Sequence, residues 1–185
     1  MKVVGIVGSP RRGGNCEDLT KLALGVLGKE GIGTELIRLC DKEIRPCDAC
    51  RACLKTGKCR IKDDFDAIYR KVVKADGLII SSPVYFGGAS PQVVAFISRF
   101  YSADDGALEN KVGGPIVVAR RAGHNFTLAE LNYFFLIHGM IVPGSTYWNV
   151  AFGRNLGEAM KDEEGVRTVK NFAKKMAWVM KRINE

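Results

Sequence analysis

Residues 2–16, KVVGIVGSPRRGGNC, decide the fold class that we predict for this chain. The run from Lys2 to Gly8 is short and rich in β-branched residues, which is typical of a buried strand in a parallel sheet. A glycine-containing loop follows the run, and apolar residues from Leu19 to Leu27 then recur at helical spacing. A strand, a loop and a helix in this order predict the first unit of an α/β protein.

The same alternation continues to the end of the chain. Four further apolar runs, separated by helical patterns, predict strands at residues 34–39, 77–80, 112–119 and 140–145. Strands separated by helices favour a parallel sheet, and right-handed crossovers favour a doubly wound one. We therefore expect a single α/β domain over residues 1–185. Its fold would be a flavodoxin-like, five-stranded parallel sheet of order 2-1-3-4-5, with helices on both faces and a cysteine-rich loop after strand 2.

Local signals predict where the later helices begin. Asp63 or Asp64 is expected to be the N-cap of one helix, and Ser90 before Pro91 starts another that runs to about Tyr101. Thr127 and Glu130 form the capping box expected for a helix through Ile137. A last helix is expected over residues 161–183.

The composition bounds the class of protein. The chain has 185 residues, 46% hydrophobic and 26% charged, which excludes a disordered or fibrous protein. It contains no apolar run long enough to span a membrane and no signal peptide at its start, so we expect a cytoplasmic protein without membrane association. Thiols stay reduced in the cytoplasm, so clustered cysteines there are more often ligands or redox groups than structural disulfides. The net charge of +8 comes with no nucleic-acid-binding motif, so we expect no nucleic acid as partner.

The loop GSPRRGGNC at residues 8–16 suits an anion. Its glycines let the backbone approach a ligand, Arg11 and Arg12 supply positive charge, and the following helix directs amides at the same place. It matches neither the Rossmann nor the Walker pattern. An ordinary glycine-rich turn is the alternative.

The loop SSPVYFGGAS at residues 81–90 follows the third predicted strand, at the expected switch point of the sheet. Pro83 stiffens it, Tyr85 and Phe86 offer flat apolar surfaces, and the glycines after them leave room for a planar ligand. The alternative is that both aromatic side chains belong to the core or to an interface.

These two loops and residues 119–144, ARRAGHNFTLAELNYFFLIHGMIVPG, resemble the flavin-binding segments of the flavodoxin-like NADPH-dependent FMN reductase family. The cysteines after the second strand make the chain similar to the iron–sulfur flavoproteins within that family. The resemblance covers about residues 2–146. It implies a flavin-dependent oxidoreductase that binds FMN and forms a homodimer or homotetramer.

The resemblance also implies a binding residue for each part of FMN. Ser9, Arg11 and Asn15 would bind the phosphate, and Cys16, where the family often has Thr or Ser, would contribute through its backbone N–H. Residues from Arg120 to Gly123 would form the third wall of the flavin site. The residues lining the isoalloxazine ring would be Pro83, Val84, Tyr85, Phe86 and Gly87.

Residues 47–59, CDACRACLKTGKC, carry four cysteines at the spacing C-x2-C-x2-C-x5-C. The first three match the ligand spacing of bacterial ferredoxins, and Cys59 is the expected fourth ligand of a single [4Fe–4S] cluster. Zinc sites more often separate two pairs by a dozen residues or more. Zinc and uncoordinated thiols remain the alternatives. The predicted metal ligands, within a cluster loop at 41–62, are Cys47, Cys50, Cys53 and Cys59; Cys40 is expected to be a small buried hydrophobe.

These features predict a redox enzyme that passes electrons between a [4Fe–4S] cluster and FMN, from a ferredoxin-like donor to a small-molecule acceptor. No catalytic side chain is required, because the flavin carries the chemistry. The first alternative is a metal-free NAD(P)H-dependent FMN or quinone reductase. The second is a non-catalytic flavin electron carrier or redox sensor.

Overall fold

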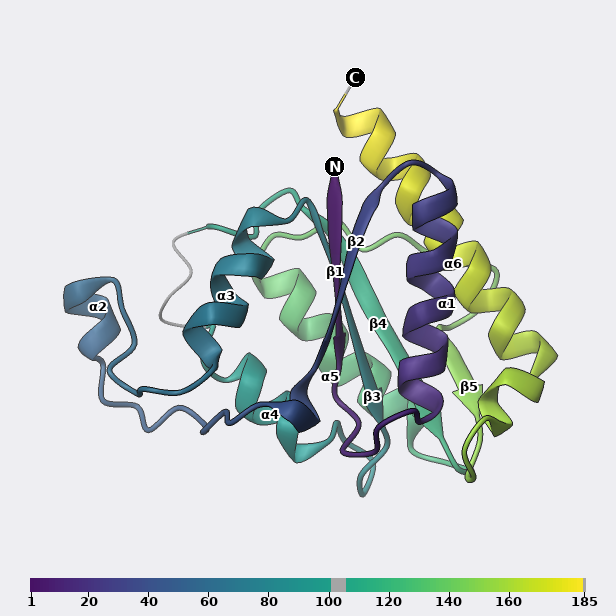
Figure 1. Ribbon diagram of the computed structural model, residues 1–185, viewed down its shortest axis with the longest axis horizontal. Helices are drawn as coiled ribbons and strands as arrows, with labels where there is room; N and C mark the ends of the chain where they lie inside the picture. The colour runs from purple at the N-terminus through teal and green to yellow at the C-terminus, as the bar shows by residue number, and fades with distance from the viewer. Residues whose placement is uncertain (101–105, 185) are drawn as a thin grey trace.

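The computed structural model describes residues 1–100 and 106–184, and its centre is a five-stranded sheet (Figure 1). The strands pair in the order β2-β1-β3-β4-β5, and every pairing is parallel. The predicted flavodoxin-like order is therefore confirmed. The strands are β1 (Lys2–Val7), β2 (Gly33–Arg38), β3 (Gly77–Pro83), β4 (Val112–Ala119) and β5 (Val150–Phe152).

Helices cover both faces of the sheet, so the apolar strands are buried from two sides (Figure 1). The helices α1 (Asn15–Lys29) and α6 (Glu163–Ile183) lie together on one face. The other face carries α3 (Phe65–Lys74), α4 (Pro91–Ile97) and α5 (His124–Ile137). The short helix α2 (Ala52–Thr56) projects from the loop after β2, away from the sheet. Two 3₁₀ turns, η1 (Leu39–Asp41) and η2 (Glu158–Lys161), complete the described structure.

The fifth strand was predicted at residues 140–145, and this placement is wrong. The ladder strand β5 lies at Val150–Phe152 and pairs with the last three residues of β4. The predicted segment makes only an isolated bridge, from Ile141 to Val112. Pro143 has no N–H to donate to a ladder, so the chain leaves the sheet edge there and returns to it farther along.

The predicted helix starts are partly right. The Ser90 hydroxyl accepts a hydrogen bond from Val93 N, as an N-cap should, and α4 begins at Pro91. The helix was expected to run to about Tyr101, which is itself outside the described residues, but it ends earlier, at Ile97. The helix α6 begins two residues later than expected, after the N-cap Asp162. The capping box at Thr127 is wrong, because α5 begins at His124.

Gly123 explains the earlier start of α5. This residue has a φ of 85° and forms the N-cap of the helix, and the Thr127 hydroxyl donates a hydrogen bond to its carbonyl. Glu130 does not reach back to the helix start. Its carboxylate accepts a hydrogen bond from Ala89 N in the loop after β3. The helix α3 begins at Phe65, and the carboxylate of Asp63 accepts a hydrogen bond from Phe65 N.

None of the helices in the described ranges is both long and apolar enough to cross a bilayer.

Candidate flavin site and cysteine cavity

A cavity of about 320 Å³ lies beyond the carboxyl ends of the central strands. Ligands of doubly wound sheets bind at this edge, where the strand order reverses. The loops after β1, β3, β4 and β5 all contribute to its walls. Its lining residues are Ser9, Pro10, Arg11, Gly14, Asn15, Cys16, Pro83, Val84, Tyr85, Val118, Arg120, Gly153, Arg154 and Leu156.

The structure brings most of the predicted flavin-binding residues to this one cavity. Ser9, Arg11, Asn15, Cys16, Pro83, Val84, Tyr85 and Arg120 line it. Three predicted residues lie outside its lining. The side chain of Phe86 is fully exposed, whereas Gly87 and Gly123 approach each other so closely that a Cβ on Gly123 would lie 3.0 Å from Gly87 Cα.

In the structure, the side chain of Asn15 contacts a segment distant in sequence. Its Nδ2 donates to Asn155 O at 2.9 Å, and its Oδ1 accepts from Ala159 N at 3.2 Å. Arg11 makes a similar link, because Nη1 donates to Arg154 O at 3.2 Å. Hydrogen bonds thus connect the loop after β1, at residues 8–16, to the loop after β5.

The loop after β5 is the part of the site that the sequence analysis missed. Gly153, Arg154 and Leu156 line the cavity. Because the fifth strand was expected ten residues earlier, these residues were not placed at the carboxyl edge of the sheet. The carboxylate of Glu158 accepts hydrogen bonds from the amides of Arg154 and Asn155, which hold the pKa of Glu158 down at about 2 and fix the loop.

The lining of the cavity carries positive charge. Arg11, Arg120 and Arg154 line it, and α1 begins beside it with no side chain capping its first turn. Uncapped amides at a helix N-terminus and nearby guanidinium groups both favour a bound anion. Ser9 is buried, and its hydroxyl accepts a hydrogen bond from Arg11 N at 3.1 Å, which shapes the turn of the loop.

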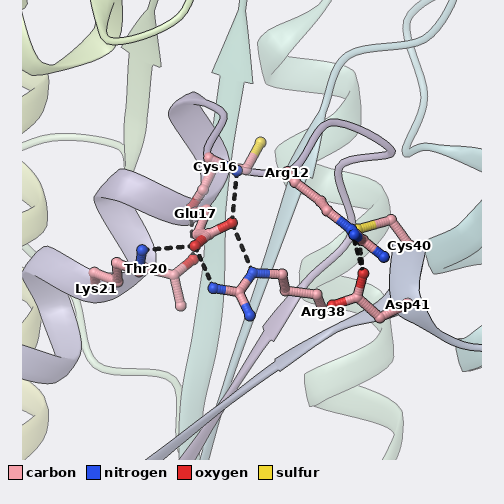
Figure 2. Close-up of polar contacts among 9 residues, drawn as sticks. Arg12, Cys16, Glu17, Thr20, Lys21, Arg38, Cys40 and Asp41 are labelled. Carbon is pink, nitrogen blue, oxygen red and sulfur yellow. Dashed lines mark hydrogen bonds and ion pairs between the residues drawn. The ribbon is translucent and has the colours of Figure 1, made fainter.

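A network of ion pairs around the buried carboxylate of Glu17 supports the loop at residues 8–16 (Figure 2). Glu17 is 1% exposed, and its carboxylate accepts hydrogen bonds from Arg38 Nε and Nη2 at 2.8 and 2.6 Å. It also accepts from Gly13 N at 2.9 Å and pairs with Lys21. The hydrogen bonds from Arg38 lead in holding the pKa of Glu17 far below its ordinary value. The Glu17 carboxylate fixes the Gly13 amide. Arg38 and Lys21 neutralise its charge, so it does not repel an anion in the cavity.

Replacing Glu17 with Ala should therefore loosen the first loop and destabilise the fold. We expect the free energy of unfolding to fall by about 2–3 kcal/mol, less than for a fully buried pair, because Arg38 can turn toward water. Denaturant unfolding measures this. Lys21→Ala, which removes an exposed partner of the same carboxylate, should change stability by less than about 1 kcal/mol. Equal losses in the two variants would contradict this account of Glu17.

The loop after β3, at residues 81–90, is held by hydrogen bonds to three different segments. Ser90 N donates to the Ser82 hydroxyl at 2.9 Å, and the Ser90 hydroxyl donates to Gly8 O at 2.6 Å. Ala89 N donates to Glu130 at 2.7 Å, so α5 supports the loop from its outer side. The loop around Tyr85 is therefore anchored to β1, β3 and α5 before any ligand binds.

The four loop cysteines line a second cavity, of about 230 Å³. Cys47, Cys50, Cys53 and Cys59 all contribute to it, together with Leu54, Arg60 and Arg99. Among the described residues, no three His, Cys, Asp or Glu side chains are grouped as the ligands of a metal ion. The sequence prediction that these thiols belong to one site is consistent with the shared cavity.

The ends of the cysteine loop are pinned together at its base. Glu43 N donates to the Asp64 carboxylate, and Asp64 N donates to Glu43 O at 3.0 Å. Arg45 N donates to the Asp63 carboxylate at 2.9 Å. Farther along the loop, Cys47 N donates to the Ser98 hydroxyl at 3.1 Å. Residues 43–47 are thus fixed against the start of α3 and the end of α4.

The remaining cysteines and histidines lie outside the cysteine cavity. Cys16 is buried, and burial raises the pKa of its thiol. Cys40 is only half-buried, unlike the buried hydrophobe expected, and its thiol contacts the Asp41 carboxylate at 3.6 Å (Figure 2). His138 hydrogen-bonds Phe134 O, whereas His124 packs edge-on against Phe152 in a separate pocket.

Comparison with known proteins agrees with this geometry. Residues 1–155 match the NADPH-dependent FMN reductase family. The whole chain is 44% identical to an iron–sulfur flavoprotein of Methanocaldococcus jannaschii over the full length of that protein. It is 38% identical to an iron–sulfur flavoprotein of Methanosarcina thermophila, covering all of this chain and 98% of that one.

A solved structure shows the same fold at low sequence identity. RosB, solved with the bound intermediate 8-demethyl-8-formylriboflavin-5'-phosphate, superposes with a TM-score of 0.81 at 20% identity. The match covers all of this chain and 80% of RosB. The family match and the full-length relatives together identify the chain as a flavin-dependent oxidoreductase. It belongs to the NADPH-dependent FMN reductase family and, within that family, to the iron–sulfur flavoproteins.

Proposed function

We propose that this protein binds FMN in the cavity above the sheet and a [4Fe–4S] cluster in the cysteine cavity, and that it passes electrons between them. The observation that carries the proposal is that all four cysteines of the loop line one cavity. The full-length relatives named iron–sulfur flavoproteins support the same conclusion.

The residues of the first cavity fit FMN. The phosphate is assigned to the loop of Ser9 and Arg11, where the uncapped start of α1 and the guanidinium groups favour an anion. Pro83, Val84 and Tyr85 offer an apolar wall to the ring. FMN supplies the redox chemistry when bound, while these residues bind and orient it.

The residues of the second cavity fit an iron–sulfur cluster. Its donors are four thiols, and thiolates are the ligands that such clusters take. The loop at 41–62 carries seven Lys or Arg against three Asp or Glu, which offsets the negative charge of thiolate ligands. A [4Fe–4S] cluster supplies electron transfer when bound.

The partners follow from the same features. A ferredoxin-like protein is the proposed electron donor, because exposed basic residues around the loop suit an acidic carrier. The proposed acceptor is a small oxidised molecule. A homodimer or homotetramer is supported by apolar side chains that α5 leaves exposed, Phe126, Tyr133, Leu136 and Ile137.

Anaerobic purification followed by iron and acid-labile sulfide analysis tests the cluster. We expect about four irons per chain, the content of one [4Fe–4S] cluster. Protein that holds FMN but no iron after anaerobic reconstitution would instead favour the alternative, a metal-free NAD(P)H-dependent FMN or quinone reductase. Turnover with an electron donor separates both from a non-catalytic carrier.

Replacing Arg11 with Ala should weaken FMN binding by about tenfold to a hundredfold. A charge-assisted hydrogen bond of about 1.5–3 kcal/mol is lost on this reading. Fluorescence titration of apoprotein with FMN measures the change, and riboflavin, which lacks the phosphate, is the control ligand. If Arg11→Ala weakens both ligands equally, the phosphate does not bind beside Arg11.

A further inference from the structure

We propose that Arg99 donates hydrogen bonds to the sulfur of the iron–sulfur cluster held by the cysteine loop, and that it raises the reduction potential of that cluster. This inference rests on the function proposed above and adds a residue outside the cysteine motif. Arg99 follows α4 in the sequence, forty residues after the last cysteine of the motif.

Arg99 is buried at the wall of the cysteine cavity. Its side chain is 1% exposed, and it lines the cavity together with all four cysteines. On one side, Nη1 donates to the Asp63 carboxylate and to Arg45 O, both at 2.9 Å. The flat face of the guanidinium lies 4.5 Å from the centre of the Phe65 ring. The group is therefore fixed in place by the base of the loop and by α3.

Two nitrogen atoms of this guanidinium, Nε and Nη2, are left over from the contacts to Asp63 and Arg45. Nε and Nη2 are both buried, and neither has a hydrogen-bond partner among the residues that the structure describes. A buried donor without a partner destabilises the fold, and a charged donor does so more strongly. Native proteins rarely leave such groups unpaired unless a ligand completes them.

The neighbouring thiols indicate what that ligand is. Cys47, Cys50, Cys53 and Cys59 all line the cavity whose wall Arg99 forms. The cavity beside the guanidinium is otherwise lined mainly by apolar surface and by the cysteines. An anionic, sulfur-rich group bound by the four thiolates would give Nε and Nη2 their acceptors.

Such hydrogen bonds favour the reduced cluster over the oxidised one. Reduction adds a negative charge to the cluster, and donors aimed at its sulfurs stabilise that added charge. The effect is strongest where water is excluded, as it is around this guanidinium. Arg99 is thus a tuning residue for the cluster, and not one of its ligands.

Arg99→Lys tests the proposal, because lysine keeps a positive charge for Asp63 but lacks the two guanidinium nitrogens, Nε and Nη2, that would donate to the cluster. We expect a cluster with unchanged iron content. At a fixed potential, its ratio of reduced to oxidised form should fall about tenfold, equal to a shift of 59 mV for a one-electron couple. Anaerobic redox titration followed by electron paramagnetic resonance measures this shift.

Arg60→Gln is the matched control. Arg60 lines the same cavity, but its side chain is 60% exposed and pairs with Asp48. Its replacement should shift the potential much less than Arg99→Lys does. An Arg99→Lys protein with a full cluster at the wild-type potential overturns the proposal and leaves the proposed function intact. A wild-type protein that assembles no cluster overturns the proposed function itself.

A second measurement applies if the Arg99→Lys protein fails to assemble its cluster. In an Arg51→Gln, Arg60→Gln double variant, Arg99 is the one arginine left among the described residues lining the cavity. With ¹⁵N in the arginine guanidinium groups, pulsed electron paramagnetic resonance of the reduced cluster should detect a ¹⁵N coupling. Its absence overturns the proposal.

Discussion

Replacing Asp63 with Ala is expected to be among the most destabilising single changes in this protein. Asp63 and Arg99 form an ion pair of 2.9 Å in which the side chains are 0% and 1% exposed. Removing one partner of a buried pair leaves an uncompensated charge and lowers the free energy of unfolding by about 3–5 kcal/mol. Denaturant unfolding of the wild type and of Asp63→Ala measures the loss.

The effect should also reach the cysteine loop. The Asp63 carboxylate accepts hydrogen bonds from Arg45 N and Phe65 N, so the base of the loop and the start of α3 lose an acceptor together. Asp66→Ala is the matched control, since Asp66 forms an exposed pair with Arg70 on the same helix. A loss below about 1 kcal/mol in Asp63→Ala, as in the control, would mean that the pair adds little to the fold.

The same pair gives the stability a dependence on pH. Burial raises the pKa of Asp63, but the hydrogen bonds from Arg99, Arg45 N and Phe65 N outweigh it and hold the pKa below its ordinary value. A carboxyl with a depressed pKa contributes stability above its unfolded pKa of about 3.9 and loses it as the pH falls through the folded value. Stability attributable to Asp63 should therefore be lost only below about pH 4.

Replacing Cys50 with Ala is expected to abolish the proposed iron–sulfur cluster and leave FMN bound. Cys50 is one of the four thiols that line the cysteine cavity, and its loss leaves three ligands for a cluster that takes four. The FMN cavity shares no lining residue with the cysteine cavity. Iron analysis and the flavin absorbance of the purified protein report the two results separately.

Cys40→Ala is the control for this experiment, because Cys40 is the other thiol close to the loop but does not line the cavity. It should keep a full complement of iron. A full cluster in Cys50→Ala would contradict the ligand set. Loss of FMN together with the cluster would show that the two sites depend on each other.

The central strands could be located because buried parallel strands are apolar, and their order followed from the alternation with helices and right-handed crossovers. The runs around Val3 and Ile79 have no other plausible place in an α/β fold. The last strand could not be placed in this way. The run at 140–145 is apolar but contains Pro143, while Val150–Phe152 is too short to stand out. Pairing with β4, and not local composition, selects the second segment.

The residues of the site could likewise be predicted only in part. Motif spacing was enough to gather the cysteines and the loop of Ser9 and Arg11. The roles of Asn15 and Glu130 could not be read from spacing, because each makes its contacts with a segment distant in sequence. Arg99 was missed for this reason as well. Its partner Asp63 was expected only as a helix cap, although it also forms a buried ion pair.

The pinned base of the cysteine loop has a consequence for how that loop can vary. Because residues 43–45 are hydrogen-bonded to residues 63 and 64, the chain leaves and re-enters the α/β body at nearly one point (Figure 1). Between these two points the loop can change in length without a change in strand order. Its further contacts, Cys47 N with the Ser98 hydroxyl and the cavity wall at Arg99, tie such a change to α4 and not to the strands of the flavin site.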